Sequence, residues 1–192
     1  MKFPRLLLCA IVLCATVARG AELDRTGGPY VPTPPAVVEA MLKLANVGPK
    51  DYVVDLGSGD GRIVLMAATK FKARGMGVDI DPELVEHANA MARKLGVADR
   101  VQFQVQDVLK ADVSRATVMT LYLLPGMMSS LQKKLMAELK PGTRIVSHDF
   151  TFDKWKPERS ITVETPEKYD LTGAWTSDVH LWVGPTPAKN AK

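Results

Sequence analysis

Cysteine is scarce in this sequence of 192 residues, and its placement excludes several kinds of site. Cys9 and Cys14 are the only two, and both lie among the first twenty residues. The rest of the chain has no thiol, which excludes a disulfide framework, a cysteine-ligated metal and a cysteine nucleophile there. We predict no metal site.

The sequence also lacks a marked excess of charge of one sign. Its formal net charge is +4, but Lys2, Arg5 and Arg19 stand in a stretch of twenty residues without an acid. Beyond residue 20 the chain carries 22 basic and 21 acidic side chains. Because nucleic-acid-binding domains usually show a clear basic excess, this balance predicts a partner other than nucleic acid.

No hydrophobic run is long enough to cross a bilayer as a helix. The apolar stretch at residues 6–18 is about 13 residues long, against roughly 20 for a spanning helix. Lys2 and Arg5 precede it, and Ala18 and Gly20 are small residues near its end, a layout typical of a secretory signal peptide. We predict that residues 1–20 direct export, to the periplasm or outside the cell. The alternative is an uncleaved segment that anchors the protein to a membrane and keeps the domain close to it.

Composition divides the remaining chain into three parts. Residues 21–35 form a segment ahead of the domain that is too rich in Pro and Gly for a helix or a central strand. Residues 36–184 are predicted to be one folded domain. Residues 185–192 are rich in Pro, Ala and Lys and are predicted to be disordered.

Within the domain, short apolar runs alternate with longer segments of helical periodicity. We predict strands at residues 52–56, 75–80, 101–105, 117–123 and 144–148, and helices at residues 37–45, 62–71, 82–95 and 127–139. This alternation is typical of βαβ units, so the predicted fold class is α/β, a single Rossmann-like, doubly wound sheet that is mostly parallel. Two last strands, 160–163 and 179–183, have no helix between them and are expected to form an antiparallel C-terminal edge.

The most informative segment follows the first predicted strand and opens a helix. Residues 55–61 have the sequence Asp-Leu-Gly-Ser-Gly-Asp-Gly. Glycines in such a turn let a ligand approach the backbone closely, and the helix N-terminus adds N–H donors. A dinucleotide fingerprint would need glycine at position 62, where this chain has Arg62, and the Gly-Lys-Ser/Thr of a P-loop is missing. The spacing Asp-x-Gly-x-Gly-x-Gly is instead similar to that of methyltransferases that use S-adenosylmethionine (SAM).

Three acids end predicted parallel strands, at the edge where open α/β sheets bind ligands. Asp55 suits a cationic amino group, Asp79 can accept hydrogen bonds from both ribose hydroxyls, and Asp107 can face the adenine amino group. Each acid alone is more often a helix cap or a turn residue, so the prediction depends on their joint spacing. The other predicted cofactor contacts are Gly57, Ser58, Gly59, Gly61 and Ile80.

The chain resembles the class I, seven-strand methyltransferases. More narrowly, it is similar to the family that contains the mitochondrial lysine methyltransferases of ATP synthase and of the adenine nucleotide translocase. This resemblance rests on Pro-Tyr-Val-Pro-Thr-Pro at residues 29–34, on residues 55–63, and on Pro-Gly-Met-Met at residues 125–128 with the helix after it. It covers roughly residues 30–155 and implies methyl transfer from SAM to a lysine ε-amine. The predicted export signal departs from the organellar relatives.

The resemblance also suggests where the acceptor binds. Tyr122 follows the fourth predicted strand, where related enzymes place residues that face the methyl group, and Tyr30 and Thr33 lie in the upstream motif, which can fold over the cofactor as a lid. We therefore predict these three as the catalytic residues, within an apolar and aromatic channel that can also include Phe150, Phe152 and Trp155. Two further residues, His148 and Asp149, either assist proton removal or belong to a loop without a catalytic role.

Other functions remain open from the sequence. The methyl acceptor is either a protein or a small molecule with an amine or hydroxyl group, because this fold serves many acceptors. A binding module that holds SAM or a related nucleoside without catalysis is a further alternative, since an exported enzyme would need SAM delivered to it. The sequence does not predict the oligomeric state.

Overall fold

The structure is a computed structural model that describes residues 28, 30–169 and 173–184. The predicted leader (residues 1–20) and the predicted disordered tail (residues 185–192) lie outside the described residues. The helices are α1 (Pro35–Leu44), α2 (Arg62–Lys70), α3 (Pro82–Lys94), α4 (Pro125–Glu138) and the short 3-10 helix η1 (Pro166–Lys168). The strands are β1 (Tyr52–Leu56), β2 (Arg74–Asp79), β3 (Val101–Val105), β4 (Val118–Leu121), β5 (Arg144–His148), β6 (Arg159–Glu164) and β7 (Thr176–Val183).

The seven strands form one sheet in the order β3-β2-β1-β4-β5-β7-β6. The strands β1 to β5 are parallel to one another, and β7 pairs antiparallel with both β5 and β6. The order reverses at β1, whose neighbours are β2 and β4, so the carboxyl end of β1 lies at a topological switch point. Open α/β sheets bind their ligands at such a point.

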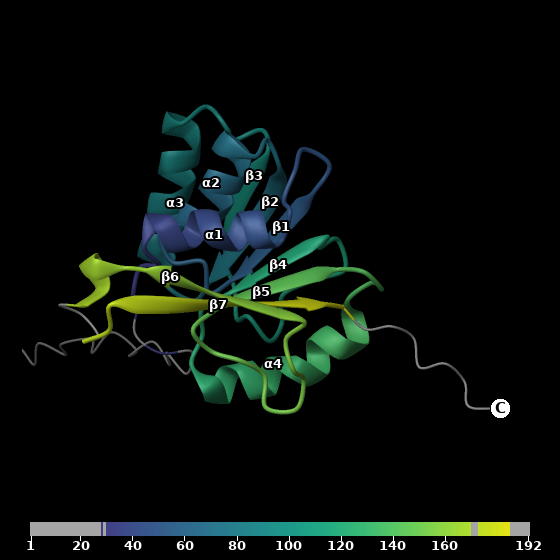
Figure 1. Cartoon of the computed structure of the whole chain (residues 1–192). Coiled ribbons are helices and arrows are strands. Elements are labelled where there is room, and N and C mark those ends of the chain that lie inside the picture. Colours follow the sequence, from purple (N-terminus) through teal and green to yellow (C-terminus); the bar gives the residue numbers. More distant parts are fainter. Residues whose placement is uncertain (1–27, 29, 170–172, 185–192) are drawn as a thin grey trace, which may run out of the picture.

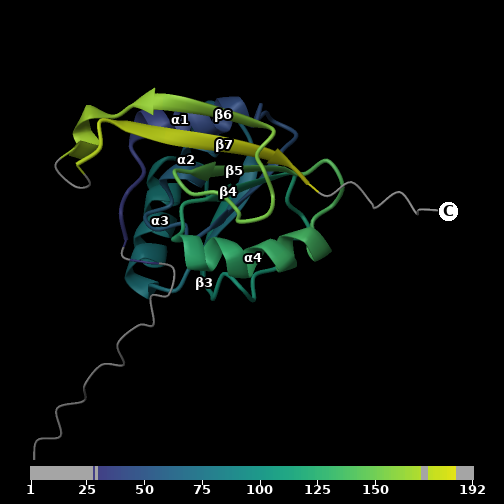
Figure 2. The same ribbon diagram turned by 60° about the horizontal axis from the view of Figure 1, so that its bottom comes forward.

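Helices cover both faces of the sheet, which explains why its central strands are apolar at every position. Figures 1 and 2 show α1, α2 and α3 on one face and α4 on the other. Val53 and Val146 pack with α1 and α2, whereas Val54 and Ile145, the residues next to them in the chain, pack in the cluster that includes α4. Alternate residues of a strand thus bury opposite faces. None of the helices that the structure describes is both long and apolar enough to cross a membrane.

The C-terminal hairpin completes the sheet as predicted, with β6 outermost and β7 between β6 and β5. In β7, Trp182 is fully buried, and its Nε1 donates a hydrogen bond to the backbone oxygen of Trp155 at 2.7 Å. Phe152 is also buried and stacks against Trp155. Since these aromatic rings pack in the core, the interpretation that Phe152 and Trp155 line the acceptor channel is wrong.

The predicted fold class is confirmed, and the element boundaries differ by a few residues. The largest change concerns the Pro-rich segment, because α1 begins at Pro35, inside the region predicted to exclude helix. Proline is well tolerated at the first helical position, where its missing N–H would have no helical partner anyway. The segment before α1 therefore leads directly into the domain.

Candidate active site

The glycine turn joins β1 to α2 at the carboxyl edge of the sheet. Gly57 and Gly59 have φ angles of 78° and 52°, in the left-handed region that favours glycine. A Cβ atom on Gly59 would lie 2.4 Å from Cε2 of Tyr30, so a side chain there would collide with that ring. The backbone N–H groups of Gly57 and Ser58 both donate to the Val78 carbonyl at 2.9 Å, which holds the turn against β2.

Asp55 is buried beneath this turn. The Thr120 hydroxyl, on the neighbouring strand β4, donates to its Oδ1 at 2.6 Å, and its Oδ2 has no hydrogen-bond partner among the described residues. Burial raises the pKa of Asp55 to about 7; the hydrogen bond from Thr120 opposes this rise, and the charges of Asp79 and Asp60 add to it. A buried carboxylate oxygen without a partner is unfavourable, and a cationic amino group would supply the missing interaction.

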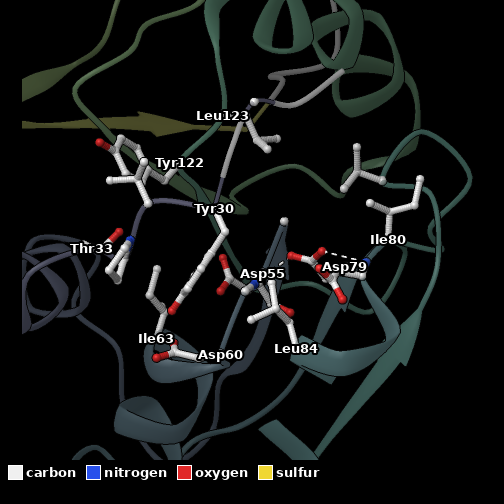
Figure 3. A pocket seen from close by; sticks show the side chains of 18 of the residues that line it. Tyr30, Thr33, Asp55, Asp60, Ile63, Asp79, Ile80, Leu84, Tyr122 and Leu123 are labelled. Carbon is white, nitrogen blue, oxygen red and sulfur yellow. Dashed lines mark hydrogen bonds between the residues drawn. The ribbon is translucent and has the colours of Figure 1, made fainter. Parts of the chain in front are cut away.

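Asp79 connects the end of β2 to the glycine turn. Its Oδ2 accepts a hydrogen bond from the Gly59 N–H at 2.8 Å, and its Oδ1 accepts one from the Asp81 N–H at 3.0 Å. Each carboxylate oxygen can accept a second hydrogen bond, as the predicted ribose contact requires. Ile80 lies beside Asp79 in the cavity wall (Figure 3).

Ser58 and Asp107 line the same cavity. The Ser58 hydroxyl is buried and, within the described part of the chain, has no hydrogen-bond partner. Asp107 has a turn role as well, because its Oδ1 accepts a hydrogen bond from the Leu109 N–H at 2.9 Å. Its contact with adenine stays a prediction.

Residues 30–34, which we call the strap, lie against the glycine turn. The Arg62 guanidinium binds both carboxylate oxygens of Asp60 and donates from Nη1 to the Thr33 carbonyl at 2.9 Å. Tyr30 lies over Gly59, and burial together with the charge of Asp60 raises its pKa. The structure thus places both predicted strap residues, Tyr30 and Thr33, at the cavity, and their catalytic roles stay predictions.

Tyr122 follows β4 and lies on the opposite side of Tyr30 from Asp79 (Figure 3). Burial, and next the charge of Asp149, raise its pKa to about 12, so its hydroxyl stays protonated near pH 7. Its ring stacks on His148 with centroids 3.9 Å apart and on Phe150 at 6.2 Å. Tyr122 and Phe150 line the cavity, whereas His148 is fully buried behind them.

Charge is distributed unevenly around the cavity. The lining carboxylates come from the ends of β1, β2 and β3 and from the glycine turn: Asp55, Asp60, Asp79, Asp81 and Asp107. The lining residues of the strap beyond Tyr30, and of the segments after β4 and β5, are uncharged: Val31, Pro32, Thr33, Tyr122, Leu123, Leu124 and Phe150. The first group suits a ligand with a cationic amino group and hydroxyls, and the second suits an uncharged acceptor.

These features fit SAM. The unpaired oxygen of Asp55 can bind its ammonium group, Asp79 can bind its ribose, and glycine leaves the backbone of the turn accessible. Among the described residues, no three His, Cys, Asp or Glu side chains are grouped so that they could hold a metal ion.

Comparison with known proteins agrees with this geometry. The ANTKMT methyltransferase domain matches residues 55–159, which run from Asp55 at the end of β1 to the first residue of β6. The chain belongs to this methyltransferase family. It is a SAM-dependent methyltransferase, which confirms the predicted resemblance and the predicted methyl donor.

Several relatives of this methyltransferase extend over most of its length. The protein-lysine N-methyltransferase of Saccharolobus islandicus (strain REY15A) is 45% identical over 137 residues, which cover 71% of this chain and 85% of that protein. An ATP synthase lysine N-methyltransferase of Xenopus laevis is 35% identical over 166 residues, covering 85% and 73%. A crystal structure titled as an RNA methyltransferase from Salinibacter ruber, in complex with S-adenosyl-L-homocysteine, is 45% identical with a TM-score of 0.75, covering 83% of this chain and 97% of that one.

Sequence reasoning missed three residues that organise this methyltransferase site. Thr120 holds Asp55, and Arg62 ties the strap to the glycine turn. His148 is predicted from the sequence only as a proton acceptor or a loop residue, but it ends β5 and contacts both Thr33 and Tyr122. The one available signal was a polar residue inside an apolar strand, as with Thr120 in Val-Met-Thr-Leu.

Proposed function

We propose that this methyltransferase methylates the ε-amine of lysine in a protein. The observation that carries the proposal is the uncharged, partly aromatic lining around Tyr122 and Phe150. A lysine must lose its proton before it can act as a nucleophile, which costs about 4.6 kcal/mol at pH 7 for an ordinary pKa near 10.4. An uncharged wall disfavours the ammonium form and so lowers this cost. The lysine methyltransferases among the relatives support the same acceptor.

The chain's own residues bind and align the reactants. When bound, SAM supplies a methyl group on a positively charged sulfur, which a neutral amine can attack. Asp55 and Asp79 fix the cofactor end, and Tyr122 and Thr33 orient the amine from the other side. Such alignment accounts for much of the rate in reactions of this kind, so no strong base is needed beside the amine.

Transfer to protein is tested with the full chain and SAM that carries a labelled methyl group. Protein and RNA fractions from a cell extract serve as separate acceptors, and acid hydrolysates of the protein are analysed for methyllysine. We expect methyllysine in the protein fraction and no label in RNA. Label in RNA alone, or in small molecules alone, would contradict the lysine assignment.

Tyr122 provides the variant that tests the acceptor side. Tyr122→Ala removes the ring that stacks on His148 and Phe150, so we expect methyl transfer to fall at least roughly tenfold, with SAM affinity changed by less than about twofold. Tyr122→Phe keeps the ring and reports on the hydroxyl alone. Equal losses of rate and SAM affinity in Tyr122→Ala, or no loss of either, would be inconsistent with a role at the acceptor.

RNA is a second candidate acceptor, because the Salinibacter ruber structure is titled as an RNA methyltransferase. The balanced charge beyond residue 20 argues against it, as does the cluster of carboxylates in the cavity wall, which would repel phosphate. The RNA arm of the same experiment decides between the two.

We also propose that residues 1–20 act as an export signal or, if they stay attached, as a membrane anchor. Their charged start, apolar run and small residues support this. Intact-mass analysis of the protein from its natural host, after membrane and soluble fractions are separated, distinguishes the two. A chain that begins near residue 21 in the exported fraction is expected, and a full-length soluble chain in the cytoplasm would exclude both.

A further inference from the structure

His148 lies between the strap and Tyr122 and contacts both. Its Nδ1 is 3.2 Å from Oγ1 of Thr33, and its ring stacks on the Tyr122 ring with centroids 3.9 Å apart. The side chain is fully buried and does not line the cavity. It can therefore affect a bound acceptor only through these two residues.

A second buried layer lies behind His148. Lys168, in η1, is 5% exposed; its Nζ donates to Oγ of Ser177 at 3.0 Å and forms an ion pair with Asp149. The same Ser177 oxygen is 2.9 Å from Nε2 of His148 and 3.3 Å from Oγ1 of Thr165. The ammonium charge of Lys168 is thus paired inside the fold, next to the histidine.

The chemistry of these groups sets the direction of the hydrogen bonds. A lysine can only donate, so Ser177 accepts from Lys168. The arrangement that satisfies every group has the Ser177 hydroxyl donating to Nε2 of His148, which leaves the imidazole proton on Nδ1. Burial lowers the pKa of His148 to about 4, with Asp149 opposing this and Lys168 adding to it, so the ring is neutral near pH 7. The Nδ1–H then donates to Thr33.

We propose that His148 is a positioning residue of the acceptor site, which orients the Thr33 hydroxyl through its Nδ1–H and supports the Tyr122 ring from behind. This inference rests on the proposed function, in which Thr33 and Tyr122 face the acceptor amine. With one lone pair of Oγ1 occupied by His148, Thr33 can accept an amine hydrogen with the other. That contact fixes the direction of the nitrogen lone pair, and such alignment strongly affects rate.

Substitutions separate the two contacts of His148. His148→Phe keeps a ring beside Tyr122 but removes the N–H that Thr33 accepts. His148→Asn keeps an N–H donor near the position of Nδ1 but removes the stacked ring. Thr33→Val removes the accepting oxygen with little change in volume, and Thr33→Ser, its matched control, keeps that oxygen.

The rate test uses the protein fraction described above as acceptor, with methyllysine as the readout, and S-adenosyl-L-homocysteine affinity is measured by calorimetry. We expect His148→Phe and Thr33→Val each to lower the rate roughly tenfold, with affinity within about twofold of the unaltered chain. Thr33→Ser should restore most of the rate, and His148→Asn should lose less than His148→Phe. The double variant His148→Phe/Thr33→Val should be no slower than either single one, because both remove the same hydrogen bond. Losses that multiply, or affinity that falls as far as the rate, would overturn the proposal.

Nitrogen-15 NMR of the imidazole rings needs no acceptor. The chain has three histidines, His87, His148 and His180, so the His148 signals are those that His148→Phe removes. We expect a neutral ring protonated on Nδ1 between about pH 5.5 and 7.5. The paired variant Lys168→Met/Asp149→Asn, which removes both charges together, should weaken that preference. A charged ring or a proton on Nε2 would overturn the proposal. Should His148→Phe fail to fold, assignment through His148→Asn and the rate of Thr33→Val still decide. Failure of the proposed function shows separately, as absence of methyllysine with the unaltered chain.

Discussion

At the scale of single residues, Asp55 links cofactor binding to pH. Its pKa of about 7 in the free protein means that a proton and the ammonium group of SAM compete for one carboxylate. The ligand needs the ionised form, so affinity rises as pH increases through 7 and falls on acidification. This residue alone should therefore give SAM binding a measurable proton dependence.

We predict that SAM affinity falls nearly tenfold between about pH 7.5 and pH 6, as expected for a single competing proton with a pKa near 7. Calorimetric titration over that range measures the effect, and it avoids higher pH, where the amino group of SAM loses its own proton. Asp55→Asn keeps the shape and removes the titration, so it should bind more weakly and without this pH dependence. A pH-independent affinity in the unaltered chain would contradict the prediction.

Thr120 shows what residue-level reasoning from sequence cannot supply. Asp55 is recognisable as a candidate ligand because its spacing to the glycines is local along the chain. Its partner Thr120 lies 65 positions away, and the two meet because β1 and β4 are adjacent with Asp55 opposite Thr120. Neither the strand order nor that register can be deduced from the residues around Asp55.

At the scale of elements, the strap depends on Arg62, the residue that distinguishes this motif from a dinucleotide fingerprint. Arg62 joins the Asp60 carboxylate to the Thr33 carbonyl and so ties the strap to the start of α2. Hydrogen bonds of charged groups typically contribute about 1.5–3 kcal/mol. A strap that packs over the glycine turn should therefore hold the cofactor more firmly when Arg62 is present.

Arg62→Met should loosen the strap without breaking the sheet. We expect faster hydrogen exchange at the amides of Val31 and Thr33, and S-adenosyl-L-homocysteine that dissociates at least roughly fivefold faster, as a loss of about 1 kcal/mol implies. Exchange mass spectrometry and stopped-flow measurements test both. Arg93→Met, in the exposed last turn of α3, is the matched control and should change neither. Unchanged exchange in Arg62→Met would show that packing alone holds the strap.

At the scale of the whole molecule, two buried groups affect stability in opposite directions as pH changes. Asp55 has a folded-state pKa near 7, above its ordinary value of 3.8, so the folded state holds a proton that the unfolded chain releases. His148 has a pKa near 4, below its ordinary value of 6.5, so the unfolded chain takes up a proton that the folded state refuses. Between pH 7 and pH 5, acidification is stabilising at Asp55 and destabilising at His148.

Each contribution is on the order of 2 kcal/mol over that interval, so in the unaltered chain the two largely cancel. Relative to it, Asp55→Asn should lose stability between pH 7 and pH 5, and His148→Gln should gain stability. Urea unfolding at pH 5, 6 and 7 without SAM measures both differences. Variants whose stability shifts in the same direction would show that these groups do not titrate as described.

Local patterns in the sequence were enough for the strands, the helices, the glycine turn and the three acids. Each of these is encoded by spacing within one stretch of chain, through alternation with a period of two or about 3.6 and through turn residues at strand ends. The Phe152 and Trp155 prediction failed because an aromatic cluster after a strand fits a cavity wall and a core equally well.

Only the tertiary structure decided which residues meet around the site. His148 reaches Thr33 across 115 positions, and Arg62 reaches it across 29. Such contacts depend on strand order, on register and on which face of the sheet a side chain occupies, and a shift of one residue in register would reverse that face. The sequence by itself therefore determined the fold class and the cofactor, because their signals are local. The structure decided how the acceptor side is held, because that is determined by residues brought together only when the sheet forms.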